Sequence, residues 1–304
     1  SEATALIRGG GVLADGRPVS RPSQKVAEDT VLTLAHDGPR YVSRAAHKLV
    51  SALDAFPVPV AGRRALELAK VMPDQRTVYL SDDGTNDAFY MFVAKRAGDL
   101  SEGQLYAARW YQTSLAGQPN GRAELSWIAL GPSATDAEVK ALLDRDIRFS
   151  EIFETSDAPD AAGDCAATGF KPLFTETGRE CLKLKPGQEL AASRLESRRY
   201  AAYLGATTEF RKTEGITYNP ATHRLYVSFS EVNRGMTDAA TGATPRDLPK
   251  VNHVRLAENY CGAVYEMVLS PNSKVGSDYV AESAASLIEG VWLANPAYPR
   301  PYPA

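Results

Sequence analysis

Cysteine is scarce and odd in number, because the 304-residue chain contains only Cys165, Cys181 and Cys261. Three cysteines do not make a disulfide framework, although one pair can form. No apolar run approaches the roughly 18 residues of a membrane span, so we expect no membrane partner. The N-terminus lacks the charged start and apolar stretch of a secretory signal. An excess of one charge is also missing: 34 basic against 37 acidic residues give −3, which excludes a globally basic nucleic-acid binder.

Enough apolar residues are present to fill a core, at 44% hydrophobic and 9% aromatic. The length predicts two domains, or one large all-β domain with an appendage. Residues 1–67 carry nine basic and seven acidic side chains, whereas the remainder carries 25 and 30, so the sign of the local charge changes. Together with a change of sequence character, this predicts a boundary between Arg64 and Lys70, with domains at 1–67 and 68–304.

The N-terminal piece has the pattern of a small α+β unit. Two short apolar runs, Gly11–Ala14 and Thr30–Leu34, flank a polar loop, and Asp15-Gly16 is a tight hairpin signal. Val42–Phe56 places its apolar residues on one helical stripe, and prolines directly after it end the helix.

The segment GGGVLADGRPVSRPSQKVAEDTVLTLAHDGPRYVSRAAHKLVSALDAF resembles the start of the hemolysin (TlyA) family of ribosomal-RNA 2′-O-methyltransferases. The resemblance implies a small RNA-binding domain, and a lysine matching Lys48 in the catalytic set. It ends near residue 67, where GRRALEL runs into AKVMPDQRTVYL instead of the glycine-rich loop for S-adenosylmethionine. Methylation is therefore not expected. Two interpretations stay open, a solvated basic face and an RNA contact through the basic residues Arg17, Arg21, Lys25, Arg44 and Lys48.

The C-terminal body is predicted to be mainly β. Short runs rich in aromatic and branched residues are separated by turn clusters, which is typical of consecutive antiparallel strands. The predicted strands are Thr77–Leu80, Phe89–Val93, Gln104–Trp110 and Glu124–Leu130.

An internal repeat connects VMPDQRTVYLSDDG, residues 71–84, with TYNPATHRLYVSFSEVN, residues 217–233. Each contains a strand end, a proline turn, a basic residue, an aromatic-centred strand and then acidic residues. Each is followed by another aromatic strand, FYMFV or AVYEMVL. Repeated four-stranded units are typical of a β-propeller, and a β-sandwich is the competing fold. The sequence thus predicts a partial β-propeller.

Helical inserts interrupt the predicted strands. Ala134–Asp144 begins with Thr135 as N-cap, and Glu138 completes a capping box. Gln188–Leu204 is predicted to be one longer helix that ends at Gly205. Its basic stripe is interpreted as solvated and consists of Arg194, Arg198 and Arg199. Residues 163–181 and 294–304 are predicted to be irregular.

Acidic residues follow the repeated strands. Asp82 and Asp83 follow one strand, Glu231 and Asn233 follow its counterpart, and Glu214 begins another. If the strand ends face a common channel, a ring of ionised acids requires cations or protons. Oxygen ligands suit Ca²⁺, and mixed carboxylate sites also suit iron or manganese. The alternative is that these acids are ordinary turn residues.

From about Glu67 onward the chain resembles the PhoX family of alkaline phosphatases, most clearly in VMPDQRTVYLSDDGTNDAFYMFVAKRAGDLSEGQLYAARW and FRKTEGITYNPATHRLYVSFSEVNRGM. The resemblance implies a β-propeller that hydrolyses phosphomonoesters with Ca²⁺ and Fe³⁺ in a carboxylate-rich axial site. It also implies a periplasmic or secreted protein.

Carried over by position, Glu67 and Glu214 match metal-binding glutamates of the family. Lys212 takes the place of a phosphate-contacting arginine, with Arg211 beside it as a substitute. Asp82, Asp83 and Glu231 are further metal candidates. The family's earlier glutamate segment, its metal-bridging cysteine and its later acidic segment have no counterpart here. We therefore expect an incomplete and impaired phosphatase whose open blade edges self-associate. An RNA-binding fragment or a non-catalytic propeller are the alternatives.

Overall fold

The computed structural model describes residues 12–14, 17–19, 32–34, 66–238 and 251–291. The chain divides into two compact units, Ser1–Lys48 and Leu49–Ala304. The predicted boundary near residue 67 stays a prediction.

In the first unit, three short strands form an antiparallel sheet in the order β2-β1-β3. They are β1 (Val12–Ala14), β2 (Arg17–Pro18) and β3 (Leu32–Leu34). Ala14 pairs with Arg17 across Asp15-Gly16, which confirms the predicted hairpin. Arg17 is exposed. The predicted helix at 42–56 and the other RNA-binding candidates, Arg21, Lys25, Arg44 and Lys48, lie outside the described residues.

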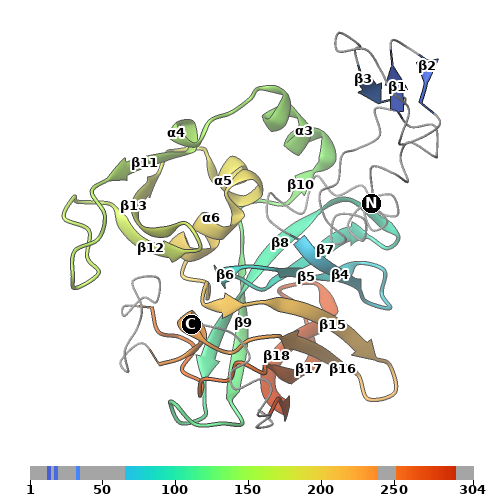
Figure 1. Ribbon diagram of the computed structural model, residues 1–304, viewed down its shortest axis with the longest axis vertical. Coiled ribbons are helices and arrows are strands. Elements are labelled where there is room, and N and C mark those ends of the chain that lie inside the picture. The colour runs from blue at the N-terminus through green and yellow to red at the C-terminus, as the bar shows by residue number, and fades with distance from the viewer. Residues whose placement is uncertain (1–11, 15–16, 20–31, 35–65, 239–250, 292–304) are drawn as a thin grey trace. The chain divides into compact units, whose positions relative to one another are not determined.

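The second unit is built on one ten-stranded sheet, and its strands pair antiparallel in the order β15-β16-β17-β18-β9-β8-β7-β5-β4, with β10 beside β8 (Figure 1). The strands of its first half are β4 (Leu66–Val71), β5 (Thr77–Asp82), β7 (Tyr90–Arg96), β8 (Asp99–Gln112), β9 (Arg122–Ala129) and β10 (Ala134–Thr135). Those of its second half are β15 (Thr213–Asn219), β16 (Arg224–Phe229), β17 (Ala263–Asn272) and β18 (Ser277–Glu289).

The sheet contains the predicted repeat. Strands β4, β5, β7 and β8 form one four-stranded antiparallel unit, and β15 to β18 form a second. In both, the first hairpin turn ends on a left-handed residue, Gln75 (φ 54°) or His223 (φ 54°), directly before an arginine. Strand β9 pairs with both β8 and β18 and so joins the units into one sheet. The edge strand β15 lies against β4 and β5, so the sheet nearly closes into a barrel. The mainly β prediction is confirmed, and the paired units are consistent with a partial propeller.

Two hydrophobic cores lie on opposite faces of this sheet. One fills the barrel-like interior around Tyr79, Trp110 and Tyr265. The other lies between the outer face and a helical layer and includes Leu80 and Tyr90. All six residues of β5 are buried, because successive side chains alternate between the two cores.

The helical layer contains α3 (Asp136–Asp144), α4 (Phe149–Ile152), α5 (Glu189–Leu195) and α6 (Ser197–Tyr203). The capping box of Thr135 and Glu138 is confirmed. The single helix predicted at 188–204 is wrong, because the chain leaves helical geometry at Glu196 (φ −129°, ψ 43°) and forms two helices. Gly205 (φ 88°) follows the second, as expected. None of the helices in the described ranges is long and apolar enough to cross a membrane.

A small antiparallel sheet adjoins these helices in the order β11-β13-β12. Its strands are β11 (Phe153–Ser156), β12 (Lys171–Thr175) and β13 (Gly178–Leu184). The irregular structure predicted for 163–181 is therefore wrong over β12 and the start of β13. A disulfide joins Cys165 to Cys181 of β13, while Cys261 is free and exposed. The sequence allowed one disulfide among its three cysteines, and one forms in the structure.

Two very short strands and one turn of 3₁₀ helix complete the described structure. Strand β6 (Thr85–Asp87) pairs with β14 (Phe210–Arg211), and the 3₁₀ turn η1 spans Arg234–Met236. The β6–β14 pair brings the end of β5 beside the start of β15.

Candidate functional site

The β6–β14 pair gathers most of the predicted site residues into one polar cluster. It places Asp82 and Asp83, at the end of β5, near Arg211 and Lys212, at the start of β15. Glu231, which follows β16, joins them through Arg211. Each of these three acids lies next to a cationic side chain, and their convergence on a common channel stays a prediction.

Arg198 of α6 is the centre of this cluster. Its guanidinium donates to both oxygens of Asp82, at 2.6 and 2.7 Å, and forms ion pairs with Asp87 at 2.8 Å and with Glu176. The side chain of Asp82 is fully buried and that of Asp87 is 1% exposed, whereas Glu176 is 45% exposed. A buried carboxylate is stable only when it is paired, and Arg198 supplies that partner.

The solvated basic stripe predicted for this helical region is wrong. Arg194 is fully buried and donates to the carbonyls of Leu130 and Pro132, both at 3.2 Å. The side chains of Arg198 and Arg199 are each 20% exposed and pair with acids. The error has a physical reason: the main acid partner of Arg198 lies 116 residues away in sequence, so helical periodicity does not reveal it.

Asp87 carries an unusual charge balance. Burial, followed by the negative charge of Asp82, raises the pKa of Asp87 to about 8, although Arg198 opposes the shift. Three carboxylates surround one guanidinium, and protonating one of them reduces the excess negative charge. A Cβ at Gly84 would lie 1.8 Å from Oδ2 of Asp87, so this approach requires glycine.

Lys212 and Arg211 form a second, more accessible layer. Lys212 Nζ donates to Asp83 at 2.8 Å, and this hydrogen bond raises the lysine pKa. Arg211 pairs with Glu231 at 2.7 Å and donates to Thr85. The side chains of Lys212 and Asp83 are about one-third exposed, at 35% and 31%. Solvent and a small anion can therefore reach the lysine.

Glu231 is held by two donors. Burial favours its neutral form, but hydrogen bonds from Arg211 and from Asn233, the latter at 3.1 Å, outweigh burial and lower the pKa of Glu231. Asn233, which follows the same strand as Glu231, thus takes part in the cluster as a donor.

Two predicted metal ligands are not part of these pairs. Glu214 is exposed and acts on Lys212 through its charge. Glu67 lies on β4, and its side chain falls outside the described residues.

The described residues do not fit the Ca²⁺ and Fe³⁺ ions that the sequence resemblance implies. Asp82, Asp83 and Glu231 each already pair with a cationic side chain. Across the described ranges, no three or more His, Cys, Asp or Glu side chains form a group that could hold a metal. The carboxylates of the polar cluster pair with protein cations instead.

Glu209 and His253 are buried titratable residues that the sequence analysis missed. Glu209 accepts from the backbone N–H groups of His253, at 3.0 Å, and Val254, at 2.6 Å, and burial raises its pKa to about 7. His253 Nδ1 and Thr207 Oγ1 are 2.9 Å apart. Burial, and then Arg109, lower the histidine pKa to about 4. These contacts hold the chain after residue 250 against the segment before β14. No local sequence pattern predicts them.

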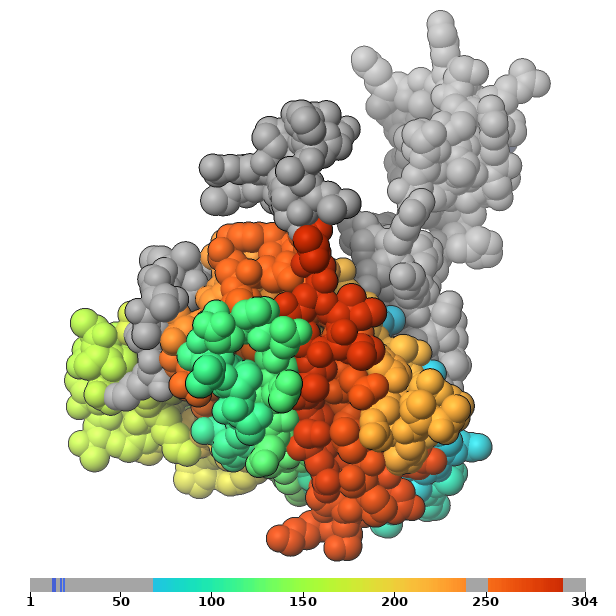
Figure 2. All heavy atoms as spheres, turned by 90° about the horizontal axis from the view of Figure 1, so that it is seen from below, coloured from blue at the N-terminus to red at the C-terminus, as the bar shows by residue number. Residues whose placement is uncertain are grey.

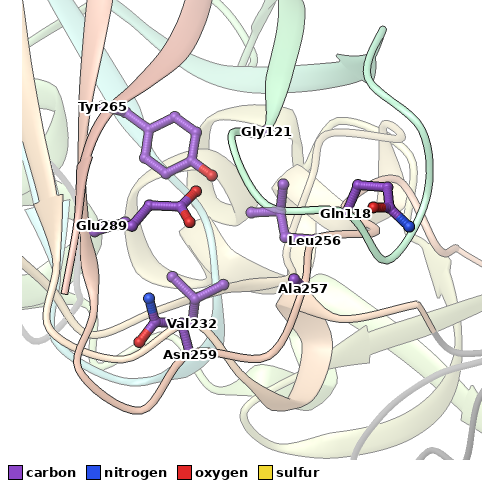
Figure 3. Close-up of a pocket in the computed structure, with 9 residues that line it drawn as sticks. Gln118, Gly121, Val232, Leu256, Ala257, Asn259, Tyr265 and Glu289 are labelled. Carbon is purple, nitrogen blue, oxygen red and sulfur yellow. The ribbon is translucent and has the colours of Figure 1, made fainter. Parts of the chain in front are cut away.

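The cavity in Figure 3 is too small for a substrate. Its volume is about 10 Å³, which is room for about one water molecule. The Tyr265 hydroxyl and the Glu289 carboxylate point into it, as Figure 3 shows. It is a small packing void with two polar groups on its wall, and a phosphate ester cannot fit inside it.

Removing the charge of Arg198 should destabilise the protein more than removing the charge of Arg199. In Arg198→Met, buried Asp82 loses its cation, and we expect a loss of about 3–5 kcal/mol in the free energy of unfolding. Arg199→Met is the matched control, because its partners Glu180 and Glu196 keep about a fifth of their side-chain surface in solvent. We expect about 1 kcal/mol there. Urea unfolding of both variants measures the difference, and equal losses would contradict the central role of Arg198.

Stability should fall as the pH rises through neutrality. The folded pKa of Asp87, about 8, lies above its unfolded value near 3.9, so its contribution is full at low pH and is lost as the pH rises to 8. For one proton the free energy of unfolding drops by at most about 1.4 kcal/mol per pH unit. Urea unfolding between pH 5 and 9 should show this slope, reduced in Asp87→Asn. The slope left in the variant combines Glu209, which lowers stability up to about pH 7, with His253, whose depressed pKa raises stability up to about pH 6.5. An unchanged slope in Asp87→Asn would refute the assignment.

Comparisons with known proteins match different parts of the chain. Over 67 residues, the chain is 49% identical to the 16S/23S rRNA (cytidine-2'-O)-methyltransferase TlyA of Mycobacterium tuberculosis, in strains CDC 1551 and H37Rv. That match covers 22% of this chain and 25% of the relative. A solved structure of Pseudomonas fluorescens PhoX in complex with vanadate, a transition state analogue, is 19% identical with a TM-score of 0.40. It matches 75% of this chain, which spans 31% of that protein.

The chain therefore spans about a quarter to a third of the length of these relatives. One match extends over most of the chain itself: the family model of the alkaline phosphatase PhoX covers residues 53–280. That range includes β4 to β17 and every residue of the polar cluster. The chain belongs to the PhoX alkaline phosphatase family.

Proposed function

We propose that the chain acts as a phosphomonoester hydrolase, with the phosphate bound at Lys212 and Arg211. The observation that carries the proposal is the family match over residues 53–280. The position of the two cations supports it, because they lie side by side where β14 leads into β15 and are partly open to solvent.

The two cations suit a phosphate monoester in different ways. The guanidinium of Arg211 offers a planar fork for two phosphate oxygens, and Lys212 offers a point charge. In the absence of substrate, Glu231 and Asp83 occupy these donors. A dianionic phosphate takes over the donors and releases the acids to solvent. Phosphoryl transfer depends on positioning and on neutralising the phosphate oxygens, which is the role proposed for this pair.

The buried layer behind the cations keeps the binding residues in place. Arg198 holds Asp82, and the hydrogen bond from Lys212 N–H to the carbonyl of Gly84, at 2.9 Å, fixes Lys212 in a left-handed conformation (φ 50°). A rigid support of this kind fixes the direction in which the lysine leaves the backbone.

Metal dependence on Ca²⁺ and Fe³⁺ is part of the proposal through the family, with Glu67 and Glu214 as its candidate ligands. Asp82, Asp83 and Glu231 do not fit such ions because each pairs with a cationic side chain, so the proposed role of this chain rests on its own cations. A periplasmic or secreted location is likewise proposed. The Cys165–Cys181 disulfide supports it, because disulfides persist in oxidising compartments.

Hydrolysis of para-nitrophenyl phosphate by the folded full chain above pH 8, with Ca²⁺ and Fe³⁺ supplied, tests the proposal. Lys212→Met should lower kcat/KM about hundredfold, as expected for losing one charged donor. Lys140→Met is the matched control, because Lys140 pairs with Asp144 on the exposed face of α3. No turnover by a chain that circular dichroism shows to be folded would refute the activity. An equal effect of both variants would refute the site.

A second candidate function, RNA binding by residues 1–67, is favoured by the 49% identity to TlyA over 67 residues. The proposed contacts are Arg17, which is exposed, and Arg21, Lys25, Arg44 and Lys48. The full chain should then shift a ribosomal-RNA fragment at 50 mM salt and lose it at 200 mM, because phosphate contacts depend steeply on salt. Arg17→Ala should weaken the shift and Arg96→Ala should not, since Arg96 pairs with Asp99 on the other unit. No shift at 50 mM salt would remove this candidate.

A further inference from the structure

Strands β9 and β18 separate along their length and leave a groove between them. They pair over only three positions, from Arg122↔Ala285 to Glu124↔Ser283. Beyond this point the space between them opens to about 570 Å³. The chain segments around the two strands, green and red in Figure 2, lie side by side on the face shown there.

The β18 side of the groove is already satisfied by side chains. The Tyr79 hydroxyl donates to the carbonyl of Tyr279 at 2.6 Å and accepts from the N–H of Ala281 at 2.8 Å. The Trp127 indole N–H donates to the carbonyl of Ala281 at 2.7 Å. These bonds replace the ladder that a neighbouring strand would otherwise provide, so this edge has no need of a partner.

The β9 side is different. The N–H of Leu130 donates to the carbonyl of Leu105, and the carbonyl of Arg122 accepts from Thr113, so even-numbered residues of this strand bond to β8. Odd-numbered residues face the other way, and the carbonyl of Gly121 does accept from Ser286 of β18.

This second ladder ends at Leu125, because the Glu124↔Ser283 pairing still engages the N–H of Leu125 with β18. Beyond it, no described residue pairs with the outward N–H and C=O groups of Trp127 and Ala129. These two successive outward positions form the edge that an added strand recognises.

The walls of the groove add side-chain specificity. Leu125, Trp127, Val275 and Val280 supply apolar surface, and Glu124, Glu282 and Lys274 line the same groove. These charges sum to −1 and therefore favour a positively charged occupant. A second copy of the chain would bring two acidic grooves together, which like-charge repulsion disfavours.

We propose that this groove binds an extended polypeptide segment, which adds to the sheet as a strand along Leu125–Ala129. Backbone hydrogen bonds to β9 supply the pairing. Alternate apolar side chains of the segment lie against Leu125 and Trp127, and basic side chains face Glu124 and Glu282. The groove is built separately from the polar cluster, so this binding does not rest on the phosphatase proposal.

The test uses the full chain and the synthetic peptide Ac-KVKVKVK-NH2. On saturation, amide hydrogen exchange of Trp127 and Ala129 should slow at least about fivefold. The exchange of Ser126 and Ile128, whose amides already bond to β8, should stay unchanged. This alternation separates strand addition from non-specific contact by a cationic peptide.

Two peptide pairs serve as matched controls. N-methylation of two valines or of two inner lysines blocks opposite edges of the peptide, so one of these isomers should lose binding and the other keep it. Ac-EVEVEVE-NH2 should bind more weakly than the lysine peptide, and Glu282→Lys should weaken the lysine peptide about two- to fivefold.

Three outcomes would overturn the proposal. One is the absence of peptide binding. Another is slowed exchange that does not alternate along β9. The third is a dimer in sedimentation that the peptide does not dissociate and that already protects Trp127 and Ala129, which would make a second copy the occupant.

Discussion

One guanidinium group holds the helical layer to the end of the central sheet. Arg198 reaches from α6 to Asp82 and Asp87, which are buried beside β5 and β6, and to Glu176, in the turn between β12 and β13. Three separate parts of the chain thus depend on a single positive charge. Since removing charges from water is costly, the arrangement is stable only because Arg198 donates to both oxygens of Asp82 and because Asp87 can hold a proton. The position of β6, and through β14 that of Lys212 and Arg211, follows from this contact.

Local features of the fold could be predicted from the sequence, whereas long-range ones could not. The capping box at Thr135 and the hairpin at Asp15-Gly16 involve residues within three positions of one another, and both are confirmed. The repeated hairpins were visible because aromatic and branched residues alternate with turn residues at fixed spacing. The break at Glu196 was not visible in the sequence, because tertiary packing determines where each of the two short helices begins and ends. The burial of Arg194 was hidden for the same reason.

The candidate site shows the same division. The sequence indicated Asp82, Asp83 and Glu231 as site residues because each follows a predicted strand. In the structure, the β6–β14 pair places them near the cationic side chains of the polar cluster. What the sequence could not supply is the counter-charge of each acid, because the cations come from a helix more than a hundred residues away or from a neighbouring strand. The sequence pattern of these acids therefore predicts a metal site, whereas in the folded structure the same acids form ion pairs. Asp87, whose protonation reduces the excess negative charge of the cluster, carries no sequence signal.

The double-sided burial of β5 determines how errors in strand pairing would propagate. Tyr79 faces the barrel-like interior and Leu80 the helical side, and alternation places Asp82 on the same side as Leu80. A shift of one residue in register would exchange the two sets of side chains and turn Asp82 into the aromatic interior, away from Arg198. A chain misregistered in this way would thus bury an unpaired carboxylate among aromatic rings, which disfavours that alignment of this strand.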